Sequence, residues 1–285
     1  MALTVRPIQV GDVPAAGRIC YEAFAAIANE HNFPPDFPDV DVATGLVGRL
    51  ITHPGVYGVV AELDGAIIGS NFVDERSAIV GLGPITVDPS AQNRGAGAAL
   101  MTHMIERAER NNTAGLRLIQ AGYHRRSLCL YAKLGFTVRE PVVHLQGSPP
   151  GVVVPGCAVR AAVIDDTAAA DRLCREVHGH DRGRDFRDAI EQGTAAVVER
   201  GGHLTGYTTQ IAFFGHAVAK TDEDLKALIA AAPSFAGPGF LLPCRNTELF
   251  RWCLEHGLRV VQPMTLMTIG LYNEPQGAYL PSILY

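Results

Sequence analysis

One stretch of the sequence decides how the rest is interpreted: Ile85-Thr86-Val87-Asp88-Pro89-Ser90-Ala91-Gln92-Asn93-Arg94-Gly95-Ala96-Gly97-Ala98. Its pattern predicts a strand, a turn, a glycine-rich loop and the start of a helix. Glycines let backbone N–H groups surround an anion, and a helix N-terminus adds about half a positive charge. No acidic residue stands between Asp88 and Glu106. The stretch predicts a phosphate-binding loop, although a Gly-x-Gly alone is also compatible with a plain turn.

Two familiar phosphate-binding loops do not fit this stretch. A Walker loop has Lys and Ser or Thr directly after its last glycine, and Ala98 follows Gly97 here. A dinucleotide-binding loop needs a third glycine and follows an N-terminal strand, and neither condition is met.

The flanking sequence predicts alternating strands and helices. Asp64-Gly65 is typical of a tight hairpin, and apolar residues from Met101 to Ala108 recur at helical spacing. Asp12, followed by Pro14, predicts a helix start. The expected strands are residues 3–8, 56–62, 66–73, 79–87, 116–121 and 138–145. The expected helices are residues 12–24, residues 125–134 and a helix that includes residues 101–108 and ends at Asn111-Asn112.

The chain also contains a diverged internal repeat. Three pairs of matching segments follow one another in the same order, and their offsets shrink from 154 to 137 to 122 residues. The pairs are Val5–Ile8 with Val159–Ala162, Glu62 with Glu199, and Gly135 with Gly257. Seventeen extra residues fall in the first copy, best assigned to Asn29–Gly45. The repeat predicts domains at residues 1–147 and 157–285, joined by a Pro- and Gly-rich linker at residues 148–156.

Two motifs carry a resemblance to a known family. Gln92-x-x-Gly95-x-Gly97 after a Val-Asp-Pro strand end resembles the acetyl-CoA pyrophosphate loop of the GNAT superfamily of N-acetyltransferases. Leu130-Tyr131-Ala132-Lys133-Leu134-Gly135-Phe136 resembles a second motif of that family. The resemblance covers the first copy well and the second faintly. It implies two GNAT-like α/β (α+β) domains, each a mixed, mainly antiparallel sheet flanked by helices.

The resemblance also implies which residues bind acetyl-CoA as the acyl-donor substrate. Backbone groups of Ile85 and Val87 would pair with the pantetheine arm. His124 and Ser127 stand where the family usually has Asn and Ala, which leaves their contact to that arm open. The pyrophosphate would be held by the amides of Gln92, Asn93, Arg94, Gly95, Ala96, Gly97 and Ala98.

Tyr131 is the candidate general acid. Acyl transfer to an amine releases a thiolate that needs a proton, and a tyrosine of pKa ~10 is protonated at neutral pH. The resemblance puts its hydroxyl near the donor's sulfur. The alternative is a ring that only packs beside Phe136.

The general base is not identified by the sequence. Asp74 and Glu75 end the third predicted strand and are the nearest carboxylates by topology, or merely a solvated strand end. The C-terminal carboxylate of Tyr285 is a second candidate, since some tandem members of the superfamily are similar in using their last residue in this way.

The second copy is predicted neither to bind a donor nor to catalyse transfer. Where a second phosphate loop would stand, Thr221 and Asp224 fit a capping box, and Asp222 and Glu223 would repel a diphosphate. The residue that matches Tyr131 is Cys253.

Composition sets the remaining limits. The net charge of −5 argues against nucleic acid as a partner, and no apolar run is long enough to span a membrane. The start of the chain is unlike a signal peptide, and the six cysteines form no C-x-x-C pair, so neither a metal site nor a disulfide framework is predicted.

The resemblance and these limits together lead us to expect a cytoplasmic N-acetyltransferase that moves an acetyl group directly to a primary amine on a small molecule or peptide. The alternative is a non-catalytic acyl-CoA sensor, and the oligomeric state stays open.

Overall fold

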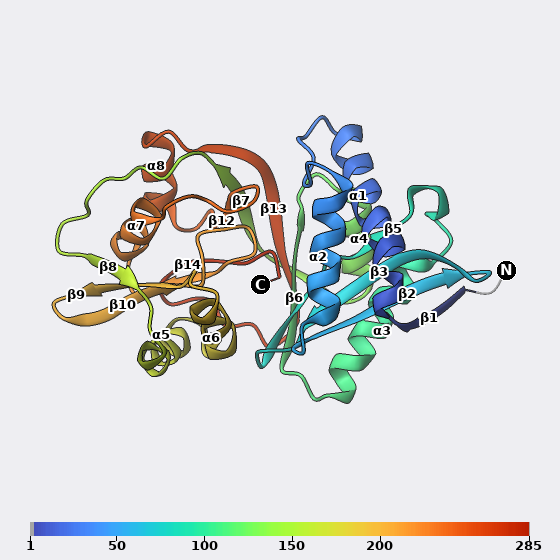
Figure 1. Cartoon of the computed structure of the whole chain (residues 1–285), viewed down its shortest axis with the longest axis horizontal. Coiled ribbons are helices and arrows are strands. Elements are labelled where there is room, and N and C mark those ends of the chain that lie inside the picture. Colours follow the sequence, from blue (N-terminus) through green and yellow to red (C-terminus); the bar gives the residue numbers. More distant parts are fainter. Residues whose placement is uncertain (1–2, 285) are drawn as a thin grey trace. The chain divides into compact units, whose positions relative to one another are not determined.

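A computed structural model describes residues 3–284, and the contacts within it divide the chain into two compact units (Figure 1). Among the described residues, the first unit comprises residues 3–138, 267–271 and 284, and the second comprises residues 139–266 and 272–283. In residues 3–284 no helix combines the length and apolarity that crossing a membrane requires.

The first unit is a mixed sheet with strand order β1-β2-β3-β4-β6, followed by the end of β13. Its strands pair antiparallel except β4 and β6, which are parallel, and the short β5 pairs with β3. The strands are β1 (Leu3–Pro7), β2 (Val56–Leu63), β3 (Ala66–Asp74), β4 (Ile79–Leu82), β5 (Thr86–Val87) and β6 (Gly115–Ala121). The helices are α1 (Val13–Glu30), α2 (Val40–Thr52), α3 (Ala96–Arg110) and α4 (Arg125–Lys133).

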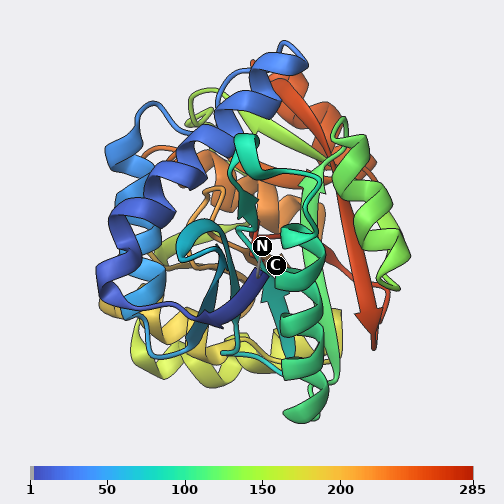
Figure 2. The same ribbon diagram turned by 90° about the vertical axis from the view of Figure 1, so that its right-hand side faces the viewer.

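Helices cover both faces of this sheet. Successive strand residues point to opposite faces, and Phe72 packs into the apolar cluster under α1 and α2, whereas Val73 packs into the cluster under α3 and α4. Figure 2 shows α1 and α2 (blue) on one side of the strands and α3 and α4 (green) on the other. The first unit is therefore a three-layer α/β arrangement with a core on each face.

The second unit repeats this plan. Its strands are β7 (Thr137–Gln146), β8 (Ala158–Ala161), β9 (Ala196–Arg200), β10 (His203–Thr208), β11 (Ala217–Ala219), β12 (Phe240–Pro243), β13 (Arg259–Gly270) and β14 (Ala278–Leu280). Its helices are α5 (Thr167–His178), α6 (Gly183–Glu191), α7 (Asp222–Ala231) and α8 (Thr247–Glu255). One sheet has the order β14-β11-β10-β9-β8, and β7 pairs with β12. Val197 and Val198 again belong to cores on opposite faces.

A matched ion-pair network supports the repeat most directly. Arg6 binds Asp12 and Glu62, each at 2.7 Å. In the second copy Arg160 binds Asp166 at 2.7 Å and Glu199 at 2.6 Å. The Asp and Glu partners are the residues that the repeat offsets of 154 and 137 pair with one another. Two copies of one fold are therefore present, as predicted.

The compact units divide the chain at a different place from the repeat. Strand β7 groups with the second unit from Arg139 onwards, and Met267–Leu271 at the end of β13 group with the first unit. β7 and β13 begin at matching repeat positions, Thr137 and Arg259. Each copy thus contributes part of its last long strand to the other unit. The domain assignment 1–147, 148–156 and 157–285 follows sequence similarity and stays a prediction.

Helix α2 was not among the elements predicted from the sequence, and two of the predicted local features also differ. Asp64 and Gly65 both have positive φ, as the hairpin turn requires, and Gly135 (φ +95°) follows the end of α4. Asp12 stands at the N-cap of α1 but makes no side-chain cap bond, because its carboxylate binds Arg6 and the amide of Gln9 instead.

The second difference is the expected strand at residues 79–87, which is interrupted between β4 and β5. Gly83 has φ +133°, and Pro84 has no N–H to continue the ladder. The prediction of one continuous strand was wrong for this reason. The interruption separates the ladder between β4 and β6 from the glycine-rich loop that follows β5.

Candidate functional site

The loop between β5 and α3 leaves the start of α3 open. The 3-10 turn η2 (Pro89–Ala91) ends at Gln92, Asn93 and Gly95 are left-handed, and α3 begins at Ala96. Gly95 is the N-cap with φ +86°, and within residues 3–284 no side chain caps the helix there. The N–H groups of a helix's first turn have no partner inside the helix. This end of α3 therefore offers donors and a positive dipole end to an anion.

The loop is exposed and carries positive charge. Asn93, Arg94 and Gly95 lie on the surface. Arg126, on α4, donates hydrogen bonds of 2.8 Å to the Oε1 of Gln92 and the Oδ1 of Asn93. Arg126 thus joins α4 to the loop and adds a second cation beside Arg94. Arg126 was not among the residues predicted from the sequence, although the Arg125-Arg126 pair at the start of a helix was a signal.

Gly97 differs from Gly95 in its role. Gly97 lies inside α3 with ordinary helical geometry, so it does not turn the loop. A Cβ built there would lie 3.4 Å from Leu130 Cδ2 and 3.9 Å from Val87 Cγ2. A methyl group fits this space and a large side chain does not. The lack of a side chain at Gly97 therefore keeps space open beside α4, whereas Gly95 turns the loop.

Tyr131 is buried in the apolar cluster between the sheet and helices α3 and α4. Its ring centroid lies 6.0 Å from that of Phe136, and its hydroxyl is hydrogen-bonded to Ser127. Burial raises the pKa of Tyr131 to about 12, against the opposing effect of the hydrogen bond to Ser127. The ring packing of the alternative interpretation is present, and the hydroxyl also has a polar partner.

His124 and Ser127 extend this polar path towards the surface. Ser127 Oγ lies 2.7 Å from His124 Nδ1. Residues 124, 127 and 131 share one helical face at spacings of three and four residues. Burial, together with nearby Arg126, lowers the pKa of His124 to about 4, so the imidazole is neutral at physiological pH. A chain of hydrogen bonds therefore runs from partly exposed His124 to buried Tyr131.

Ile85 and Val87 lie on the segment that leads into the loop. Val87 pairs with Gly69 in the ladder between β5 and β3, and Ile85 is half-buried just before that ladder. Strand β4 lies between β3 and β6, and its parallel ladder with β6 ends at the pair Gly81 and Arg117.

Glu75 lies apart from these residues. It follows β3 five residues beyond Ser70, where β5 pairs, so it is roughly 16 Å along the strand at ~3.3 Å per residue. Both its oxygens accept hydrogen bonds from Arg107, at 2.7 and 2.9 Å. Asp74 is likewise paired with Arg76. These ion pairs are typical of a structural role at the strand end.

Tyr285 lies outside the described residues. The residue before it, Leu284, shows where the described chain ends. Leu284 groups with the first unit and packs against the apolar cluster under α1 and α2. A Cβ built on Gly81 would collide with the carbonyl oxygen of Leu284. The end of the described chain therefore lies against β4, beside the interruption that separates β4 from β5.

Comparison with known proteins identifies the first unit. Residues 54–138 match the family described as an acetyltransferase (GNAT) domain. The chain contains a GNAT acetyltransferase domain. The matched range holds the loop, α3 and Tyr131. A search of curated proteins found no match.

Solved structures extend the GNAT likeness to both units. A Pyrococcus horikoshii protein described as an acetyltransferase is 17% identical with a TM-score of 0.74, over 97% of this chain and 94% of that one. A GCN5-related N-acetyltransferase from Sphaerobacter thermophilus is 16% identical with a TM-score of 0.62, over 95% and 96%. A tandem GNAT protein from the clavulanic acid biosynthesis pathway is 16% identical with a TM-score of 0.57, over 99% and 100%. At these identities the likeness shows the fold, a tandem GNAT fold.

The second GNAT copy lacks the open helix start of the first. Thr221 caps α7 by accepting from the amide of Asp224, as predicted, and its hydroxyl donates to the Asp224 carboxylate at 2.7 Å. Cys253, in place of Tyr131, is fully buried. In addition, β14 pairs antiparallel with β11, whereas the corresponding β4 of the first copy pairs with β6. The C-terminal strand thus occupies the edge of β11.

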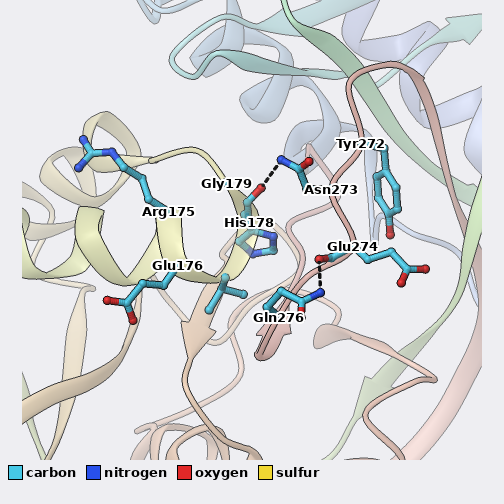
Figure 3. Close-up of a pocket in the computed structure, with 9 residues that line it drawn as sticks. Arg175, Glu176, His178, Gly179, Tyr272, Asn273, Glu274 and Gln276 are labelled. Atoms are coloured by element: carbon cyan, nitrogen blue, oxygen red, sulfur yellow. Dashed lines mark hydrogen bonds between the residues drawn. The ribbon is translucent and has the colours of Figure 1, made fainter.

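The second unit also holds an open pocket of about 450 Å³ (Figure 3). It lies between the end of α5 and residues 272–276. The side chain of Asn273 donates to the carbonyl of His178, and the backbone N–H of Gln276 donates to the carbonyl of Val177. Its other lining side chains are Arg175, Glu176, Tyr272 and Glu274. None of the site residues predicted from the sequence lines this pocket.

Proposed function

We propose that the first GNAT copy transfers an acetyl group from acetyl-CoA directly to a primary amine within a ternary complex. The observation that carries the proposal is the open N-terminus of α3, preceded by the left-handed Gly95 in a GNAT domain. We assign donor binding to residues 1–147 and treat residues 157–285 as a copy that no longer binds a donor. All six cysteines are free thiols, which suits a reducing cytoplasm.

Donor binding would use the exposed loop and the residues before it. The amides from Gln92 to Ala98 would surround the pyrophosphate, with Arg94 and Arg126 as counter-charges. Backbone groups of Ile85 and Val87 would pair with the pantetheine arm.

Acetyl transfer forms a C–N bond, breaks the C–S bond of the thioester, and requires a proton for the thiolate. The amine nitrogen attacks the thioester carbonyl, the C–N bond forms, and the C–S bond breaks to release a thiolate. Tyr131 gives its proton to the sulfur, and the proton lost by the amine restores the balance. A phenol whose pKa is about 12 stays protonated at neutral pH but is a weak acid. The path through Ser127 and neutral His124 can return a proton to the phenolate, since imidazole accepts at one nitrogen while it donates from the other.

The rival function is an acyl-CoA sensor without turnover. A thiol-release assay with acetyl-CoA and a panel of primary amines separates the two, alongside calorimetric binding of CoA. We expect CoA binding and amine-dependent thiol release. CoA binding with no release from any amine or amine-bearing peptide would favour the sensor, and absence of CoA binding would reject both.

Each chain is expected to bind about one CoA. The first copy offers an uncapped helix start, whereas Thr221 occupies that position in the second, with three acidic residues in the first turn of α7. A negative charge at an exposed helix N-terminus gains about 0.3–1 kcal/mol from the helix dipole, and in α7 the acidic side chains already occupy that position and repel a further anion. Calorimetric titration gives the stoichiometry directly. Two equivalent sites per chain would contradict the assignment of the second copy.

Extension of the C-terminus tests whether the carboxylate of Tyr285 is the general base. Leu284 lies against β4, and three added glycines would place the terminal carboxylate three residues further along the chain from this point. We expect lower turnover at neutral pH and partial recovery at high pH, where more of the amine is already neutral. The matched control carries the same glycines at the N-terminus. Normal activity of the C-terminally extended protein would exclude this role.

A further inference from the structure

Gln120 on β6 is an unusual residue for the core of the first unit. Its side chain is 6% exposed. Neither its Oε1 nor its Nε2 has a hydrogen-bond partner among residues 3–284. A buried amide left without partners is costly, and buried polar groups in native proteins are nearly always paired. This amide therefore indicates a partner that is not part of the chain.

The position of Gln120 in the sheet shows where that partner would lie. The last register pair between β4 and β6 is Gly81 with Arg117, an offset of 36 residues. The same offset brings Gln120 level with Pro84, next to Ile85. At this level the strand beside β6 is interrupted, because β4 has ended and β5 pairs with β3 instead. Gln120 thus lies beside the segment to which the pantetheine arm is assigned.

The direction of the side chain agrees with this placement. Alternate residues of a strand share a face, so Gln120 points to the same side as Leu116 and Leu118. Both leucines pack into the apolar cluster that contains Tyr131. Gln120 is therefore on the Tyr131 side of the sheet.

We propose that Gln120 binds a secondary amide in the pantetheine arm of the acyl donor. A primary amide side chain is complementary to a secondary amide, because Oε1 accepts from its N–H and Nε2 donates to its carbonyl. The arm of CoA carries two such amides, and its nucleotide portion carries none. Gln120 is a donor-binding residue by this assignment, which rests on the proposed function.

The test compares two ligands in three full-length proteins. Gln120→Met keeps the length of the side chain and removes both polar atoms, and Leu118→Met makes a matched change on the same face. Calorimetry measures the affinity for CoA and for adenosine 3′-phosphate 5′-diphosphate, which lacks the arm. We expect Gln120→Met to bind CoA about tenfold more weakly, as loss of one or two hydrogen bonds predicts. Its affinity for the nucleotide should be unchanged, and Leu118→Met should match the wild type with both ligands.

The melting temperature of the ligand-free proteins completes the test. Gln120→Met should melt at or above the wild-type temperature, because it removes a buried unpaired amide. Equal CoA affinity in the wild type and Gln120→Met would overturn the proposal and leave acetyl-CoA binding intact, with a buried water as the partner. An equal loss with both ligands would also overturn it, and Gln120→Leu repeats the test should the Met variant fail to fold. Failure of the wild type to bind CoA would instead reject the proposed function itself.

Discussion

Replacement of Tyr131 by Phe is expected to lower turnover by roughly 10²–10⁴-fold while the affinity for acetyl-CoA changes little. The substitution keeps the ring, which packs near Phe136 in the core, and removes only the hydroxyl bound to Ser127. The departing thiolate would then have to take its proton from solvent in a buried site. Steady-state kinetics with a productive amine, together with calorimetric CoA binding, measures both quantities.

Tyr57→Phe is the matched control for this prediction. The Tyr57 hydroxyl lies 3.2 Å from His103, and its ring lies under the Arg107 guanidinium, so Tyr57 contacts α3 beyond the predicted donor loop at its start. We expect this variant to retain full turnover. A Tyr131→Phe protein with normal turnover would leave Tyr131 with a packing role alone.

Replacement of Gly97 by Trp is expected to abolish measurable CoA binding, a loss of at least about 100-fold, or about 2.7 kcal/mol. The space at Gly97 is bounded by Leu130 at 3.4 Å and Val87 at 3.9 Å, so an indole must project into the region in front of α3. That region is where the open N–H groups face the proposed pyrophosphate. Calorimetry measures the affinity, and circular dichroism checks that the variant is folded.

Gly97→Ala separates this steric effect from a general intolerance of substitution. Its methyl group would make an ordinary contact with Leu130 and improve the local helix propensity. We expect CoA affinity close to that of the wild type. A folded Gly97→Trp protein that binds CoA normally would show that the anion site lies elsewhere.

Short-range patterns were enough to predict much of the fold. The Asp64-Gly65 hairpin, the helix from Ala96 to Arg110 and the glycine stop after α4 follow from backbone preferences and apolar spacing over a few residues. The repeat was visible because Arg6 and Arg160 keep the same partners in both copies. The glycine-rich loop and the Tyr131 motif likewise lie within single segments, so their resemblance to GNAT motifs was visible in the sequence.

Other features depend on residues that are distant in sequence, and no local pattern predicts them. In the sequence nothing pairs with Glu75, and in the structure Arg107, 32 residues later, donates a hydrogen bond to its carboxylate. Arg126 reaches back to Gln92, and β14 lies along β11 although about 60 residues separate them. The division of β7 and β13 between the units is of the same kind. Backbone preferences act over a few residues, whereas ion pairing, strand exchange and the burial of Gln120 arise only when the packed chain brings distant segments together.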